Sequence, residues 1–499
     1  MKKKIFGFLM PLALLASCDS YLDVKSEFEV DSNEIFSTTD GFEMAINGIY
    51  RLMSSDQLYA KNLTWGFASA LGQNYKQGTT SNKTDITYDY VNYSAVPSVI
   101  WDKAFNVIAN VNQVLAQSLK KDASFYDTDL HKDVIEGEMY GLRALMHFEL
   151  MRYFTPAFTK TEHKKTVLMP YVDTYPCPYP THISTGEILE KAIKDMHIAR
   201  EKLAYIDTLA YYGQNGNYTY RFKSNSGTTK PPSMFFMFRG SRMNYMATDA
   251  LLARMYMWKG DYRNARFHAS EVIRGYRNYV KFSFEKYTDL NAASSFRPTR
   301  PSEIIMALYK KVSYHWDAYE STVSSDYSSA NLTMEDAVMD ALFAGDETDT
   351  RYSGKYWKNS EYYLNKHYAT YTRLTNSLGG YGDSNMEYYG GLFPVISLPE
   401  MYFIVAECDI RNGDIASAME KINYLRQQRG ILESALPVEG TTEEEAMNYL
   451  RREVVRDGLT FGQTFFWFKR QGKNIWNGLN EIEMTEERWT IPVPDGETI

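Results

Sequence analysis

The chain has 499 residues, 44% of them hydrophobic and 23% charged, so it can bury a large core and lacks the composition of a disordered protein. Its formal net charge is −8, and no basic cluster occurs beyond the first four residues, which excludes nucleic acid as an expected partner. Aromatic residues make up 15% of the chain, with 40 tyrosines, so flat amphipathic side chains are abundant.

The N-terminus has the pattern of a secretory signal. Lys2–Lys4 precede an uncharged apolar run over Ile5–Leu15, which is too short to span a bilayer. Leu15-Ala16-Ser17 lead directly into Cys18 and resemble a bacterial lipobox. We therefore expect residues 1–17 to be removed and Cys18 to be lipidated. The mature chain would carry 51 basic and 62 acidic residues, a net charge of −11, and would meet the membrane through its lipid alone.

The mature chain, residues 18–499, is predicted to be one mainly helical domain built from helix pairs. Ser184 and Glu187 have the spacing of a capping box at the start of an amphipathic helix. Two later apolar stripes each stop at a Gly-Asp pair, Gly260-Asp261 and Gly413-Asp414, before a second stripe begins. This is the pattern of a tetratricopeptide helix pair. We expect helix pairs around 41–155, 184–206, 246–275, 398–430 and 441–472.

The helix pairs do not form a regular array. The two Gly-Asp turns lie 153 residues apart, whereas tetratricopeptide units repeat about every 34 residues. Large loop-rich insertions are expected around 207–245, with some strand content, and around 276–395. Since insertions on a helical scaffold usually carry its binding function, we expect the ligand face there.

Several segments, taken in order, resemble one known family. They are Gly41–Tyr50, Asn110–Leu115, the block Leu398-Pro399-Glu400-Met401-Tyr402 that continues to Arg426, and Ile491-Pro492-Val493-Pro494 near the end. Together with the signal sequence, they are similar to the SusD/RagB proteins. One segment departs from the family: Phe461–Gly472 keeps a glycine at Gly462 but lacks the Arg–Asp pair that members commonly have.

The resemblance implies a lipid-anchored protein on the extracellular side of the outer membrane of Bacteroidetes. Such proteins bind nutrients, typically glycans and in some members peptides, and deliver them to a SusC-like, TonB-dependent transporter. These expectations come from the resemblance and not from composition or spacing.

A glycan site needs exposed aromatic planes beside polar side chains, because sugar rings present apolar faces with hydroxyl groups around them. Two segments offer this mixture. The first contains Trp65, Asn74, Tyr75, Tyr88 and Tyr90, and it falls where family members place part of their ligand site. The second lies inside the long insertion and contains Tyr314, Trp316, Asp317 and Tyr319.

Catalytic and metal-binding motifs are missing from the sequence. Neither His-Glu-x-x-His nor Cys-x-x-Cys occurs, and no phosphate-binding loop is present, so we expect no metal, no cofactor and no catalytic residue. Asp346–Asp349 lacks the glycine and the distant glutamate of a calcium loop, and we interpret it as a polar turn.

The sequence favours a non-catalytic binding lipoprotein. A surface glycoside hydrolase remains an alternative, since a fold can bring together two carboxylates that are distant in sequence. A helical adaptor that binds only protein is a third alternative. Which glycan or peptide the protein binds stays open.

Overall fold

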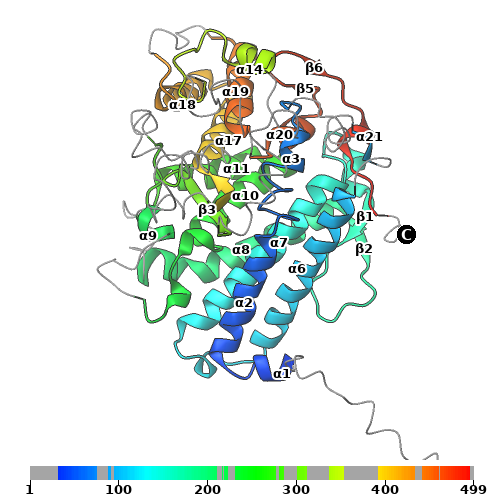
Figure 1. Cartoon of the computed structure of the whole chain (residues 1–499), viewed down its shortest axis with the longest axis vertical. Helices are drawn as coiled ribbons and strands as arrows, with labels where there is room; N and C mark the ends of the chain where they lie inside the picture. The colour runs from blue at the N-terminus through cyan, green and yellow to red at the C-terminus, as the bar shows by residue number, and fades with distance from the viewer. Residues whose placement is uncertain are drawn as a thin grey trace, which may run out of the picture.

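The computed structural model describes residues 32–75, 88–90, 95–210, 216, 218–222, 231–276, 280–285, 300–311, 336–352, 391–432, 441–459 and 461–494. Within them the fold is mainly helical, as predicted (Figure 1). The helices are α1 (Ser32–Ile35), α2 (Thr39–Met53), α3 (Phe67–Ala70), α6 (Val96–Ser118), α7 (Leu130–Phe154), α8 (Thr185–Tyr205), α9 (Tyr218–Phe222), α10 (Tyr245–Lys259), α11 (Tyr262–Arg274), α14 (Asp336–Phe343), α17 (Leu398–Arg411), α18 (Ile415–Gln428), α19 (Glu443–Gly458), α20 (Thr464–Gln471) and α21 (Glu486–Trp489). The strands are β1 (Val167–Pro170), β2 (His182–Ser184), β3 (Ile304–Tyr309), β4 (Leu392–Ser397), β5 (Ile475–Trp476) and β6 (Glu481–Ile482).

Left-handed glycines make the turns of the two predicted helix pairs. Gly260 has φ 80° and ends α10, and Gly413 has φ 81° and follows α17. The side chains of Asp261 and Asp414 then cap α11 and α18 by accepting hydrogen bonds from backbone N–H groups three residues further on. Both helical hairpins are therefore confirmed, as is the capping box of Ser184 at the start of α8.

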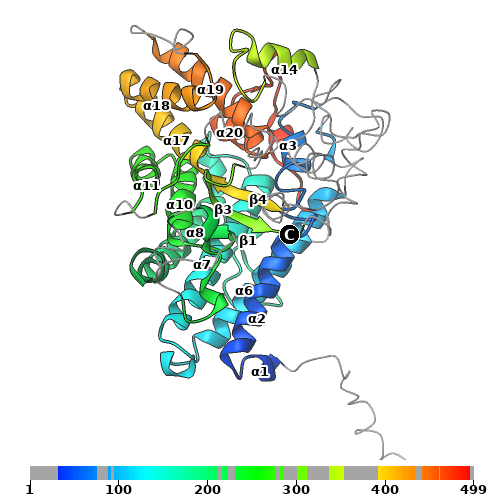
Figure 2. The same ribbon diagram turned by 60° about the vertical axis from the view of Figure 1, so that its left-hand side comes forward.

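The helices form one continuous series of neighbours. α2 packs on α6, α6 on α7, α7 on α8, α8 on α10 and α10 on α11. α11 then packs on α17, although residues 275–397 separate the two helices in the sequence. Figure 2 shows the series rising from α2 to α18. The predicted interruption is thus an insertion in the sequence between α11 and α17, and the two helices pack on each other in the scaffold.

Buried ion pairs fix neighbouring helices to one another. The guanidinium of Arg143 on α7 donates to both carboxylate oxygens of Asp195 on α8, at 2.7 and 3.0 Å. Asp195 also accepts from the hydroxyl of Tyr171 at 2.6 Å. Since all three side chains are buried, this bidentate pair fixes the register of the two helices.

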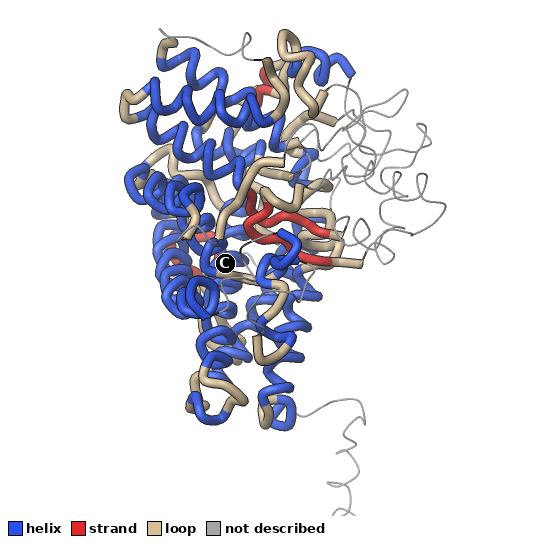
Figure 3. Tube along the Cα trace, turned by 90° about the vertical axis from the view of Figure 1, so that its left-hand side faces the viewer, coloured by secondary structure: helices blue, strands red, loops and turns tan. Residues whose placement is uncertain are grey.

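The two insertions contribute a small sheet and short helical turns. β3 and β4 pair antiparallel, with Ile304 opposite Ser397 and Tyr309 opposite Leu392, and Figure 3 shows the pair beside the helices. The described part of 207–245 contains helical turns, including η5 (Met234–Phe236) and η6 (Arg239–Ser241), and no strand. In this described part the Ser233 hydroxyl caps η5 and buried ion pairs hold Arg239 in η6. The strand content expected of the whole insertion stays a prediction.

The turn at Asp346–Asp349 follows α14; its Glu347 is exposed to solvent, but its two aspartates are buried. Asp346 pairs with Arg456 at 2.7 Å and Asp349 with Arg351 at 2.6 Å, and both aspartates are buried. The predicted polar turn is therefore present, with Glu347 and Thr348 at the surface. Its two aspartates compensate the charges of buried arginines.

Candidate functional site

The five described residues of the first predicted ligand segment are buried. Trp65 is 0% exposed, and its indole N–H donates to the carbonyl of Ala60 at 2.5 Å. The hydroxyl of Tyr75 donates to the carbonyl of Trp65 at 3.2 Å, and that of Tyr88 to Leu71 at 3.0 Å. Burial raises the pKa of the Tyr88 hydroxyl. These polar atoms are satisfied by the protein backbone.

The same segment is fixed to the C-terminal part of the chain. The side-chain amide of Asn74 donates to the carbonyl of Asn477 at 2.9 Å, and the hydroxyl of Tyr90 to that of Arg488 at 2.9 Å. A sugar-stacking platform needs exposed aromatic planes, whereas these side chains pack in the core. The buried residues are Trp65, Asn74, Tyr75, Tyr88 and Tyr90. Contact of these residues with a ligand is not tested by this burial and stays a prediction.

The second predicted segment, with Tyr314, Trp316, Asp317 and Tyr319, lies outside the described residues, as does Cys18. The described chain reaches Lys311, just after β3. Lys311 lines a groove that is a better defined candidate site.

This groove, here called the α2–β3 groove, lies between the second half of α2, the turns η5 and η6, and the end of β3. Its volume is about 1000 Å³, which suits a ligand of several rings. Aromatic, methionine, basic and hydroxyl side chains are mixed in its wall. The lining residues are Glu43, Asn47, Tyr50, Arg51, Ser54, Ser55, Met234, Phe235, Met237, Phe238, Ser241, Arg242, Leu308, Tyr309, Lys310 and Lys311.

A buried carboxylate holds the wall of the groove in place. Glu138 accepts hydrogen bonds from Tyr50 at 2.9 Å and from Arg242 at 2.8 Å. Burial alone would raise the pKa of Glu138, but Arg242 and Arg239 hold it below its usual range. Arg242 also lies over the ring of Phe235, with 4.2 Å between the guanidinium carbon and the ring centroid. The groove therefore has a rigid, preorganised wall.

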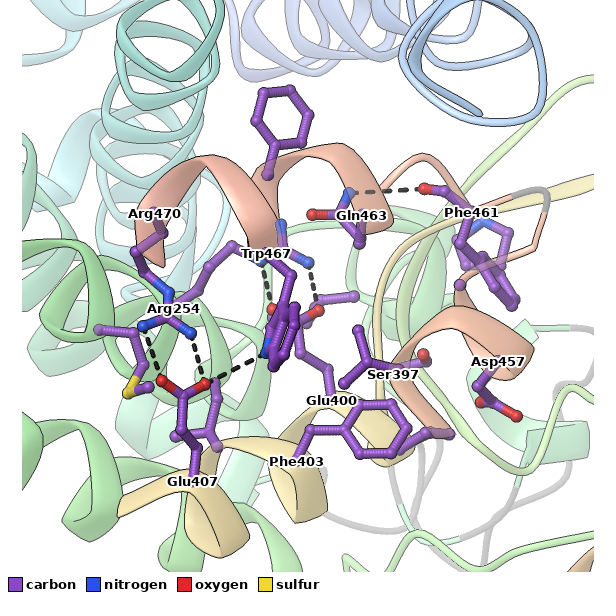
Figure 4. Close-up of a pocket in the computed structure, with 18 of the residues that line it drawn as sticks. Arg254, Ser397, Glu400, Phe403, Glu407, Asp457, Phe461, Gln463, Trp467 and Arg470 are labelled. Carbon is purple, nitrogen blue, oxygen red and sulfur yellow. Dashed lines mark hydrogen bonds and ion pairs between the residues drawn. The ribbon is translucent and has the colours of Figure 1, made fainter. Parts of the chain in front are cut away.

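A second hollow, the α17–α20 cleft, is smaller, at about 90 Å³ (Figure 4). Its side chains include Phe403 and Trp467, both half-buried. The indole N–H of Trp467 donates to Glu407 at 3.2 Å, and Arg470 donates to the other oxygen of Glu407 at 2.9 Å. The segment Phe461–Gly472, which departs from the family pattern, lines this cleft. Its Arg470 forms an ion pair with Glu407 of α17.

The carboxylates of this cleft are paired with arginines. Arg254 donates to both oxygens of Glu400, each at 2.6 Å. Burial would raise the pKa of Glu407, but Arg470 and Arg411 hold it below its usual range. A glycosidase needs one carboxylic acid whose pKa is raised, whereas the pKa of Glu407 is lowered here.

Among the described residues, no group of three or more His, Cys, Asp or Glu side chains is placed to hold a metal ion. No described helix is both long and apolar enough to cross a membrane. Cys177 and Cys408 are free thiols.

Sequence reasoning missed the α2–β3 groove. Its wall comes from three separate parts of the chain, and only the run Met234–Phe238, with three phenylalanines and two methionines, gave a local signal. Such a density of large apolar residues in a loop-rich insertion indicates either a small core or a binding surface.

Comparison with protein families identifies the chain. A model of the SusD family matches residues 184–467, more than half of the sequence, so the chain belongs to the SusD/RagB family. A second model, described as starch-binding associating with outer membrane, matches residues 20–209. At the level of the family, these matches mean carbohydrate binding in association with the outer membrane.

Two curated relatives come from Formosa agariphila. SusD-like protein P2 is 22% identical over 313 residues, which are 60% of this chain and 52% of that protein. SusD-like protein P38 is 25% identical over 210 residues, which are 41% of this chain and 38% of that protein. The chain thus spans between about two fifths and half the length of these relatives.

Solved structures share the fold at low sequence identity. A SusD superfamily protein from Bacteroides thetaiotaomicron superimposes with a TM-score of 0.66 at 18% identity, over 92% of this chain and 97% of that one. A SusD-like carbohydrate binding protein from Bacteroides vulgatus gives a TM-score of 0.61 at 14% identity, over 88% and 84%. The predicted fold class is confirmed.

Proposed function

We propose that this protein binds a glycan nutrient at the cell surface without cleaving it, and delivers it to a SusC-like, TonB-dependent transporter. Membership of the SusD family, through the match over residues 184–467, is the observation that carries this proposal. The α2–β3 groove supports it, because half-buried Tyr50, Phe238 and Tyr309 lie there beside polar side chains.

Peptide binding in the same groove is the second candidate. It is favoured by Met234 and Met237, because flexible thioether side chains adapt to varied apolar partners. The segment of Tyr314, Trp316, Asp317 and Tyr319 is proposed as a further stacking platform, since it begins three residues after Lys311.

Binding and cleavage can be separated in one experiment. Purified protein should be retarded in native gels that contain its polysaccharide, chosen from soluble starch, xylan, galactomannan and inulin. Incubation with that polysaccharide should release no new reducing ends. Retardation together with new reducing ends would support the glycoside hydrolase, and no retardation in any gel would contradict glycan binding.

Cys18 is proposed to anchor the mature protein to the outer membrane by lipid, with the protein facing the extracellular side. The change Cys18→Ala should release the protein from membranes into a soluble fraction, because it removes the thiol that carries the lipid. Membrane fractionation in high salt, followed by immunoblotting, measures the effect. Cys408→Ala serves as a control, since this buried thiol has no role in anchoring.

A further inference from the structure

The backbone of Phe238 adopts a conformation that a bulky residue rarely takes. Its φ is 56° and its ψ is 37°, in the left-handed region. Glycine takes this conformation freely, whereas a side chain with a Cβ atom is strained there. A strained residue persists only where the surrounding structure holds it, and such residues cluster at functional sites.

The residues that follow Phe238 hold this conformation in place. The guanidinium of Arg239, which is 1% exposed, donates to Asp207 at 2.8 Å and to the carbonyl of Met243 at 2.8 Å. The carbonyl of Phe238 accepts from the backbone N–H of Ser241 at 2.8 Å. The turn therefore keeps its shape through backbone and Arg239 contacts, none of which uses the Phe238 ring.

The Phe238 ring lies in a different environment from the ring of Phe235. The ring of Phe235 packs against Phe236 at 5.3 Å and against His131 at 5.5 Å, measured between centroids, and it is buried. Phe238 is half-buried and lines the α2–β3 groove. Among the described residues it belongs to no hydrophobic core cluster and has no ring contact with another aromatic residue or a cation. Core packing does not explain a strained phenylalanine here.

Polar side chains of the groove complement this ring. Asn47 and Arg51 are exposed on α2, and Lys310 lies at the end of β3 with its ammonium group 2.7 Å from Asp56. A sugar ring that lies on an aromatic face needs hydrogen-bonding groups of this kind at its edge.

We propose that Phe238 is a ligand-contacting residue: its ring forms a stacking platform for the apolar face of a sugar in the α2–β3 groove. The left-handed backbone presents the ring to the groove. This inference rests on the proposed glycan-binding function and deepens it, since it names the residue on which the sugar ring lies.

The change Phe238→Gly separates a binding role from a structural one. Glycine suits the left-handed backbone, so the melting temperature should stay within about 2 °C of wild type or rise. Affinity for the polysaccharide that retards the wild-type protein should fall about 10-fold or more, because an anchoring ring is removed. Phe238→Tyr keeps the ring and should retain the wild-type affinity within about 3-fold.

The matched control is Phe267→Ala, which removes a ring that is 53% exposed on α11. Alanine is used there because glycine would disturb the helix, and affinity should stay unchanged. Isothermal titration and thermal unfolding are measured on each variant. Wild-type affinity in Phe238→Gly, or a fall in its melting temperature well beyond 2 °C, would overturn the inference alone. Failure of the wild-type protein to bind any of the four polysaccharides would instead overturn the glycan-binding function.

Discussion

Replacing Arg351 with leucine should lower the free energy of unfolding by about 3–5 kcal/mol, because it leaves three buried carboxylates without their shared cation. The guanidinium of Arg351 lies 2.6 Å from Asp349, 2.6 Å from Glu453 and 3.0 Å from Asp457. Arg351 is 1% exposed, so water cannot replace the missing charge without opening the structure.

Arg351 belongs to a larger buried network with equal numbers of cations and anions. Burial alone would raise the pKa of Glu453, but Arg351, Arg456 and Arg426 hold it well below its usual range. The network joins the start of β3, the turn after α14, the end of α18 and the last turns of α19. Its members are Arg300, Arg351, Arg426, Arg429 and Arg456 with Glu303, Asp346, Asp349, Glu453 and Asp457.

Urea unfolding at pH 7, followed by circular dichroism, measures this loss. Arg274→Leu is the matched control, because its ion pair with Glu271 lies at the surface and the Arg274 side chain is 72% exposed. An exposed pair contributes about 0–1 kcal/mol, so the control should be close to wild type. Equal stability of Arg351→Leu and Arg274→Leu would show that the network does not hold these elements together.

The parts of the fold that could be predicted from the sequence depend on local signals. A capping box needs only Ser184 and Glu187, three residues apart, and a helical hairpin needs a glycine with an aspartate after it, as at Gly260 and Gly413. These signals act within one or two helical turns. From these signals the two helical hairpins could be predicted, together with the long insertion between them.

The buried aromatics and the charge network could not be predicted in this way. Asn74 and Asn477 are 403 residues apart, and Tyr90 and Arg488 are 398 apart, yet each pair is hydrogen-bonded. A loop rich in tyrosine and asparagine looks exposed when such partners are unknown. The α2–β3 groove has the same difficulty, because its wall comes from three separate parts of the chain.

Gly462→Ala should lower the free energy of unfolding by about 2–4 kcal/mol, through a backbone strain and a steric clash together. Gly462 has φ 72°, in the left-handed region. A Cβ atom there would lie 2.5 Å from the Cβ of Ala68 and 2.8 Å from the carbonyl oxygen of Thr64. Since a carbonyl of the backbone cannot turn aside as a side chain can, the segment before α20 would have to move away from α3.

Gly260→Ala isolates the clash from the strain. Gly260 has nearly the same φ, 80°, but nothing lies within 4 Å of the Cβ that would be added. Its replacement should therefore lower stability by only about 1 kcal/mol, the cost of a left-handed alanine. Urea unfolding of both variants measures the difference. A larger loss of stability for Gly462→Ala than for Gly260→Ala would show that the absence of a side chain at Gly462 lets the C-terminal helices pack against the segment of Trp65. Equal losses would contradict that role.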